Sequence, residues 1–423
     1  MRLNLAVALV AIVGLNSCTL EDQLTVPTFG QSEFISQTYP LDQSMKDAIN
    51  GVYAVDRGSD RFGEEVVLIW NARDRLTVLT GKDVGYFVLE GGRLDSVFFF
   101  EGYWRYQVNS ETGLARFVVS KEDGGRFLMG DDAASGRLIL DGGIGERESA
   151  PSTAVTFRYV RPIRPEILSQ KFTILAHRGG GRTSDLIPHS ENTVELVRIA
   201  EHFGANGVEI DVRLTRDGVP VLYHDNTLNP RLVQKIPMIG SMKDYTYAQL
   251  RSFVRLINGE QIPKLEDVLK TIVYETNLKF VWLDSKAEGE DLIARVVPLL
   301  EQYTAEAAVL TAQGKRDSLQ IMVGVPSEEI YDELLRYPSY TSVPTIAEKD
   351  LERARTLNSP VWAPLWSGGI VTSDIATAHS EGRRVITWTL DEPEFVRQYI
   401  NSGQYDGILS NYPMIVAYYH YVR

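Results

Sequence analysis

One stretch, residues 174–225, decides the fold of this chain. It reads ILAHRG at 174–179, HSENT at 189–193, GVEIDV at 207–212 and PVLYHD at 220–225. Two of these apolar runs end on His-Arg and His-Asp, and a third carries Glu209 and Asp211. Side chains at i and i+2 of a strand lie on one face, so these two carboxylates can approach the same cation. The stretch therefore predicts a metal-assisted site for an anionic substrate near strand ends.

A hairpin is predicted inside this stretch. Only three residues, the last a glycine, separate Thr215 from Val219. Such a loop is typical of a hairpin and is too short for a parallel crossover. If Thr215 faces Val219, the register places Asp211 opposite Tyr223. His224 then lies beside the carboxylate pair. The alternative is two ordinary strands with solvated charges at their ends.

The motifs in this order resemble the signature of the glycerophosphodiester phosphodiesterases. The resemblance rests on HRG at 177–179, ENT at 191–193, EID at 209–211 and HD at 224–225, and it spans about residues 172–413. It implies metal-dependent hydrolysis of a small-molecule glycerophosphodiester to glycerol phosphate and an alcohol. Two other functions stay open. One is a related phospholipase or lyase acting on lipid or sugar-phosphate diesters, and the other is a non-catalytic lipoprotein that binds ligands.

The resemblance also implies the metal ligands. Glu209, Asp211 and Asp284 would form an oxygen-only set, which favours Mg²⁺ or Ca²⁺ over Zn²⁺. The family carries Glu-x-Lys where this chain has DSK at 284–286, so Asp284 keeps the charge on a shorter arm. A helix cap or a surface acid is the alternative for Asp284.

Roles for the other site residues follow from the same resemblance. His177 and His224 are the general base and acid, in an order that the sequence leaves open. Arg178 and Lys286 hold the phosphate and its developing charge. The attacking group is either water or a hydroxyl of the substrate itself, which would give a cyclic intermediate.

Three further residues are assigned with alternatives. Glu191 and Asn192 are expected to orient the first loop, and Asn192 is also a candidate cap for the helix that follows. Trp388 lies on a late strand and either contacts substrate or fills the barrel core. DGILSNYP at 406–413 resembles the closing segment of the family, with Ser410 and Asn411 in place of Thr and Asp.

The composition indicates a folded, acidic protein. The chain has 423 residues, of which 44% are hydrophobic and 23% charged, so it can bury a core. Its length allows about three domains, or fewer if one is a barrel. The formal net charge of −13 repels nucleic acid and anionic lipid, so nucleic acid is not expected as a partner. A phosphate substrate would need a local basic pocket.

Residues 1–18 are expected to be a lipoprotein signal peptide. Arg2 precedes a short apolar run over 3–15, and LNSC at 15–18 resembles a bacterial lipobox with Cys18 as the lipidated residue. Cys18 is the only cysteine, which excludes an internal disulfide. Residues 19–40 are expected to be a tether. The chain would then be exported and anchored in a membrane through Cys18, facing the periplasm or the cell surface. A cleaved secretory peptide with an incidental cysteine is the alternative.

Residues 41–160 predict a smaller antiparallel all-β domain of unknown role, either a lipocalin-like barrel or a sandwich. After a short helix at 41–49, alternating runs recur about every 8 to 12 residues with turn residues between them. The aromatic run at 98–106 is expected to be strand packing, with a ligand cavity as the alternative. The strands are expected at 65–70, 75–80, 85–89, 94–106, 115–120, 126–129, 137–140 and 153–159, with a break at Gly91-Gly92.

Residues 171–423 predict an α/β fold, a TIM-type (β/α)8 barrel, because strands alternate with helices there. The linker at 161–170 opens with RPIRP, whose two prolines mark a stiff boundary. That boundary predicts that residues 166–423 fold alone. The pattern is least regular over 311–347. Barrel strands are expected at 171–176, 207–214, 219–224, 279–284, 308–310, 320–323, 360–363, 384–390 and 407–409.

Overall fold

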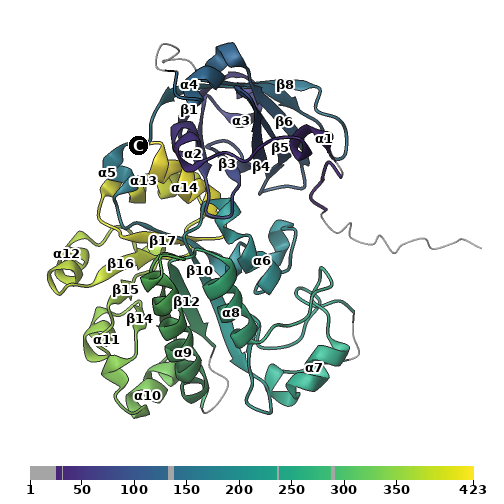
Figure 1. Cartoon of the computed structure of the whole chain (residues 1–423). Coiled ribbons are helices and arrows are strands. Elements are labelled where there is room, and N and C mark those ends of the chain that lie inside the picture. The colour runs from purple at the N-terminus through teal and green to yellow at the C-terminus, as the bar shows by residue number, and fades with distance from the viewer. Residues whose placement is uncertain (1–24, 31, 132–137, 236–237, 287–290) are drawn as a thin grey trace, which may run out of the picture.

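Two closed barrels follow one another along the chain, an antiparallel one and then a parallel one (Figure 1). The computed structural model describes residues 25–30, 32–131, 138–235, 238–286 and 291–423. The signal segment and Cys18 lie outside the described residues. Among the helices that are described, none is long and apolar enough to cross a membrane.

The first barrel has eight antiparallel strands, each paired with its neighbour in sequence, and β8 closes on β1. Of the two architectures expected, the barrel is therefore confirmed and the sandwich is wrong. Two short helices, α1 (Glu33–Ser36) and α2 (Gln43–Ile49), precede it. The strands are β1 (Gly51–Arg57), β2 (Glu65–Trp70), β3 (Leu76–Thr80), β4 (Gly85–Leu94), β5 (Val97–Tyr106), β6 (Thr112–Val119), β7 (Ile139–Ile144) and β8 (Thr153–Arg161).

Aromatic side chains fill the interior of this barrel. Phe87, Phe117 and Phe157 come from three strands and pack at ring-centroid distances of 5.1–5.9 Å. Phe98 and Trp104 from the aromatic run are fully buried in the same cluster. The run therefore serves strand packing, as expected.

Three local expectations in this domain are wrong. Residues 126–129 form no strand, because the Ser120 hydroxyl caps a turn that continues into the short helix α4 (Arg126–Leu128). The Gly91-Gly92 pair does not break the chain but lies inside β4. A side chain at Gly91 would meet the Trp70 ring at 2.7 Å, so the glycine permits close packing there. Strand β1, together with helix α3 (Ser59–Phe62) after it, was not expected.

The second barrel closes through eight parallel strands in the order β9, β10, β12, β13, β14, β15, β16, β17 and back to β9. The TIM-type expectation is confirmed. The strands are β9 (Thr173–Ala176), β10 (Gly207–Leu214), β12 (Phe280–Ser285), β13 (Gln320–Val325), β14 (Thr345–Glu348), β15 (Val361–Ala363), β16 (Arg384–Thr387) and β17 (Gly407–Ser410). The helices are α5 (Pro165–Leu168), α6 (Val194–Arg198), α7 (Tyr247–Phe253), α8 (Leu265–Glu275), α9 (Leu292–Ala312), α10 (Glu328–Arg336), α11 (Leu351–Thr356), α12 (Thr372–Ser380), α13 (Pro393–Ser402) and α14 (Pro413–Tyr421).

Residues 219–224 do not form a barrel strand. They contribute β11 (Pro220–Leu222), which pairs antiparallel with the end of β10 outside the parallel ring. The pairs Val212–Leu222 and Leu214–Pro220 have the register that the three-residue loop predicts. The hairpin itself is therefore confirmed.

Two expectations in and beside the irregular segment are wrong. Residues 308–310 belong to the last turns of α9 rather than to a strand. The strand β14 at 345–348 was not expected, because it lies where the alternation of strands and helices is least regular.

The two barrels share one hydrophobic cluster. Leu79 and Tyr86 of the first barrel pack with Phe203 and Ala417 of the second, and the Tyr86 and Phe203 rings lie 5.4 Å apart. Helix α14 lies between the barrels in Figure 1. The apolar interface does not favour the expectation that residues 166–423 fold alone.

We expect a fragment of residues 166–423 to aggregate or to melt well below the full chain. Removing the first barrel exposes the apolar side chains that pack against it, and each buried Val, Leu or Phe side chain contributes about 1.5–3 kcal/mol. Size-exclusion chromatography and thermal unfolding of the fragment beside the full chain test this. A monomeric fragment that melts at the same temperature as the full chain would contradict this expectation and show that residues 166–423 fold alone.

Candidate active site

Three carboxylates meet at the carboxyl ends of two neighbouring strands of the parallel barrel. Glu209 and Asp211 are two positions apart on β10, and the strand register places Asp284 of β12 directly beside Asp211. One oxygen from each of the three lies within 4.8 Å of the others. The common face that the i, i+2 spacing predicts is therefore present. In barrels of this type the loops at this end form the active site.

The donor set suits a hard divalent cation. Glu209 Oε1 and Asp284 Oδ1 are buried oxygens without a hydrogen-bond partner among the described residues, whereas Asp211 Oδ1 is paired with the Lys286 ammonium. Buried carboxylate oxygens are costly unless a cation or a donor faces them. The Lys286 ammonium forms ion pairs with Asp211, at 3.0 Å, and with Asp284, which offsets part of the negative charge. Oxygen ligands of this kind fit Mg²⁺ or Ca²⁺.

Burial and the charges of neighbouring groups give the three acids different pKa values. Burial raises the pKa of Glu209 well above its ordinary range, and the charges of Asp211 and Asp284 raise it further. Burial likewise raises the pKa of Asp284. Burial acts against the carboxylate of Asp211 too, but Lys286 and other nearby cationic groups lower its pKa below the ordinary value. A cation must therefore compete with a proton for this cluster.

His177 follows β9 and faces the carboxylates. Its Nε2 lies 3.6 Å from Glu209 Oε2, and its Nδ1 lies 2.7 Å from Asn411 Oδ1. The Asn411 amide nitrogen donates to Asp391 at 2.6 Å, which turns the amide oxygen toward His177. Nδ1 then carries the proton and Nε2 is left with a lone pair. Burial, with the charge of Arg178, lowers the pKa of His177 to about 3, so the imidazole is neutral near pH 7.

His224 follows β11 and has a different partner. Its Nδ1 lies 2.7 Å from Asp225 Oδ1. Arg231 contacts the same carboxylate at 2.6 and 3.0 Å, and Asn229 donates to it at 2.8 Å. Burial opposes ionisation of Asp225, but these hydrogen bonds lower its pKa. An ionised carboxylate at Nδ1 orients an imidazole and stabilises a positive charge on it.

Arg178 links the first loop to the metal ligands. Its backbone has the left-handed φ of 53°, which costs about 1–3 kcal/mol for a residue with a side chain. In this conformation its amide donates to Glu209 Oε2 at 2.8 Å and its guanidinium to Glu191 Oε1 at 2.7 Å. Among the described residues its Nε has no hydrogen-bond partner, and it lies 4.0 Å from Asp211 Oδ2. One guanidinium nitrogen thus remains for a ligand.

Asn192 orients Asp211, a candidate metal ligand, rather than capping a helix. Its amide nitrogen donates to Asp211 Oδ2 at 2.7 Å, and its amide oxygen accepts the Asp211 backbone N–H at 2.9 Å. The cap of α6 is instead Thr193, whose hydroxyl accepts the Leu196 N–H. The cap expected at Asn192 is therefore wrong by one residue.

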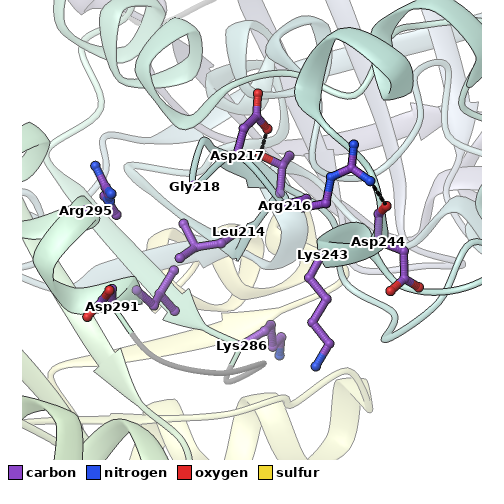
Figure 2. Close-up of a pocket in the computed structure, with 11 residues that line it drawn as sticks. Leu214, Arg216, Asp217, Gly218, Lys243, Asp244, Lys286, Asp291 and Arg295 are labelled. Atoms are coloured by element: carbon purple, nitrogen blue, oxygen red, sulfur yellow. Dashed lines mark hydrogen bonds between the residues drawn. The ribbon is translucent and has the colours of Figure 1, made fainter.

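A charged cavity of about 570 Å³ adjoins Lys286 (Figure 2). It lies between the tip of the β10–β11 hairpin and the start of α9. Apart from Leu214 and Leu292, its lining is polar and consists of Thr215, Arg216, Asp217, Gly218, Lys243, Asp244, Lys286, Asp291 and Arg295. Of the site residues described above, Lys286 is the one that lines this cavity.

Two of the contacts made by the Trp388 side chain serve barrel packing. Its indole N–H donates to the Ala363 carbonyl at 2.8 Å, and its ring packs edge-on against Trp282 at 6.3 Å. The ring is partly exposed, and its contact with substrate stays a prediction. His189 lies 3.5 Å from Glu260 at the edge of the same region.

Three side chains of the site were not assigned a role from the sequence. Arg231 bridges Asp225 and Glu191, and Asp391 fixes Asn411. Glu348 at the end of β14 is buried, and burial together with the charge of Asp284 raises its pKa well above the ordinary range. The run IAE at 346–348, apolar and ending on an acid, was a signal for Glu348. Arg231 and Asp391 lie in loops and carry no such signal.

The model of the glycerophosphoryl diester phosphodiesterase family matches residues 177–415. The chain belongs to this family. The expected class, a phosphoric diester hydrolase, is thereby confirmed. The match begins at His177 and includes the metal-ligand candidates and both histidines.

Known members of the family align with the second barrel. A glycerophosphodiester phosphodiesterase of Bacillus altitudinis is 26% identical over 250 residues, which are 57% of this chain and 94% of that protein. Glycerophosphodiester phosphodiesterase 1 of Homo sapiens is 34% identical over 107 residues, or 23% of this chain and 30% of that protein. A phosphodiesterase of Oleispira antarctica, solved with the product sn-glycerol-3-phosphate, is 21% identical with a TM-score of 0.46 and covers 57% of this chain and 94% of its own.

Proposed function

We propose that this enzyme hydrolyses glycerophosphodiesters to glycerol phosphate and an alcohol at the cluster of Glu209, Asp211 and Asp284. The observation that carries the proposal is a cluster of three carboxylates, two of them with an oxygen that has no hydrogen-bond partner among the described residues, flanked by His177 and His224 in a member of this family. The three acids would hold one divalent cation. When bound, the cation neutralises phosphate charge and polarises the phosphoryl oxygen.

The two histidines divide the proton transfers. His177 is neutral and presents a lone pair at Nε2, so it acts as the general base that takes a proton from the attacking hydroxyl group. His224, paired with Asp225, acts as the general acid that gives a proton to the departing alkoxide. One P–O bond forms and one breaks. The attacking hydroxyl belongs to water or to the glycerol moiety, and the second route passes through a cyclic phosphate that water then opens.

Two cations contact the phosphate in this proposal. Arg178 offers its unpartnered Nε, and Lys286 offers the ammonium that now pairs with Asp211 and Asp284. Both stabilise the charge that develops on the non-bridging oxygens. Glu191 and Asn192 orient the loop and Asp211.

The phospholipase alternative would be helped by an apolar mouth at the acid cluster. The cavity beside Lys286 does not decide between the two substrates, because Lys286 is the one proposed site residue in its lining. A purely ligand-binding role is disfavoured because both histidines and all three acids are present. The cation is Mg²⁺ or Ca²⁺. Asp284 has a short arm, and Ca²⁺ accepts looser oxygen shells than Mg²⁺ does.

We further propose that the protein is exported and anchored in a membrane through a lipid on Cys18. The proposal rests on the apolar run at 3–15 and the LNSC segment. Mass spectrometry of the mature N-terminus in a membrane fraction tests it. A diacylated Cys18 is expected, and a soluble protein cleaved elsewhere would contradict it.

The proposed reaction is tested by identifying products. Purified full-length protein would be incubated with glycerophosphodiesters, lysolipids and inositol phosphodiesters, with and without chelator. We expect glycerol phosphate from the glycerophosphodiesters and none in chelator. Turnover of lysolipids alone would favour the phospholipase alternative, and turnover of no diester would favour a binding protein.

A further inference from the structure

One arginine of the first barrel reaches into the loop that follows the first strand of the catalytic barrel. Arg105, at the end of β5, is fully buried. Its Nη2 donates to the carbonyl oxygens of Leu186 and Asp185, the latter at 3.3 Å, and lies 3.4 Å from the carbonyl of Asn109. Leu186 has a left-handed φ of 53°, an uncommon conformation for a leucine. Arg105 therefore binds the loop at a strained point.

Asp185, one of the two loop residues whose carbonyls Arg105 binds, is connected to His177. The Asp185 carboxylate binds the Arg182 guanidinium at 2.8 and 3.0 Å and accepts the Tyr412 hydroxyl at 3.1 Å. Tyr412 follows Asn411, whose amide oxygen contacts His177 Nδ1 at 2.7 Å. Only a few contacts separate the buried arginine from the proposed base.

A second connection runs to the phosphate-binding arginine. The Thr183 amide donates to Glu191 Oε2 at 2.8 Å, and Glu191 accepts the Arg178 guanidinium at 2.7 Å. Between these two connections, the loop packs closely against the first barrel. A side chain at Gly181 would lie 3.1 Å from the Asn411 carbonyl and 3.3 Å from the Gln107 amide nitrogen.

We infer that Arg105 is a positioning residue and that the first barrel orders the catalytic loop over residues 181–187. The family match begins at residue 177, so this support comes from outside the matched region. Without Arg105 two loop carbonyls lose a buried donor, and the loop is freer to shift. Displacements of about 1 Å at a reacting group can cost about 10²-fold in rate. The inference deepens the proposed function and rests on it for its effect on activity.

The test compares Arg105→Met, Arg105→Lys and wild-type protein, all full length. Arg158→Met is the matched control, because Arg158 belongs to the same barrel but pairs at its surface with Asp56 at 2.8 and 2.9 Å. Two readouts are needed: hydrogen–deuterium exchange of the peptide spanning 181–187, and kcat and KM on a soluble glycerophosphodiester well below the melting temperature.

For Arg105→Met we expect about tenfold faster exchange in this peptide. We also expect a fall of about 10- to 100-fold in kcat with a smaller change in KM, since the groups affected act in the chemical step. Arg105→Lys should be intermediate, and Arg158→Met should match wild type in both readouts. A role in stability alone would lower the melting temperature without changing kcat at low temperature.

Wild-type exchange and wild-type kcat in Arg105→Met would overturn the inference. If wild-type protein cleaves no diester, the proposed function fails, yet the exchange comparison still decides whether Arg105 orders the loop. If Arg105→Met does not fold, Tyr412→Phe replaces it, because this change removes the hydroxyl that contacts Asp185 and Arg182 of the same loop. The inference then requires a lower kcat at an unchanged melting temperature, and an unchanged kcat refutes it.

Discussion

Alanine at His177 or at His224 is expected to lower kcat by about 10²- to 10⁴-fold, the usual contribution of a positioned acid or base. The Nδ1 atoms of the two histidines have different partners: an amide oxygen at 2.7 Å for His177 and a carboxylate oxygen at 2.7 Å for His224. Steady-state kinetics on a soluble glycerophosphodiester measure the loss. Circular dichroism should show that both variants keep the wild-type fold.

His379→Ala is the matched control for these variants. His379 is partly exposed and pairs with Asp406 at 2.9 Å, before β17 and away from the carboxyl ends of the strands. It should turn over like wild type. Near-wild-type turnover by the His177 or the His224 variant would remove that residue from the mechanism.

Alanine at Asp284 is expected to raise the metal concentration needed for half-maximal activity by at least about tenfold, because one of three charged oxygen ligands is lost. Asp284→Glu should be tolerated better than Asp284→Asn, since it keeps the charge while Asp284→Asn removes it. The strand register sets Asp284 beside Asp211. Oδ1 of Asp284 has no hydrogen-bond partner among the described residues. Metal titrations of activity for the three variants give the comparison.

Asp317→Ala controls for the loss of an acid elsewhere on the barrel. Asp317 pairs with Lys279 at 2.8 Å and is half-exposed, ahead of β13. Its removal should leave the metal dependence unchanged. The same unchanged dependence in Asp284→Ala would assign Asp284 a structural role, as a cap or a surface acid.

The geometry of the acid cluster was predictable because it depends on short-range rules. The spacing of Glu209 and Asp211 fixes their common face, and the three-residue loop fixes the register of β11 on β10. These two relations need only the direction and period of strands. Asp284 was assigned through the family resemblance, and the register of β12 on β10 places it beside Asp211.

Other parts of the site depend on contacts between distant segments, which a local pattern does not encode. Arg231 and Asp391 lie in loops whose paths are set by the tertiary fold. Arg105 meets its loop 80 residues away in sequence, across the boundary between two barrels. Strand β14 lies where the pattern of strands and helices is least regular, so its IAE run was overlooked and Glu348 was missed with it.

The central claim is that a divalent cation bound by Glu209, Asp211 and Asp284 makes this enzyme a phosphodiesterase. Its most direct test is a titration of Mg²⁺ or Ca²⁺ into metal-stripped full-length protein, with binding followed by calorimetry and glycerol phosphate release followed in parallel. We predict one site per chain, no release before the titration and recovery of activity along the binding curve. Full activity of the metal-stripped protein in excess chelator would contradict the claim.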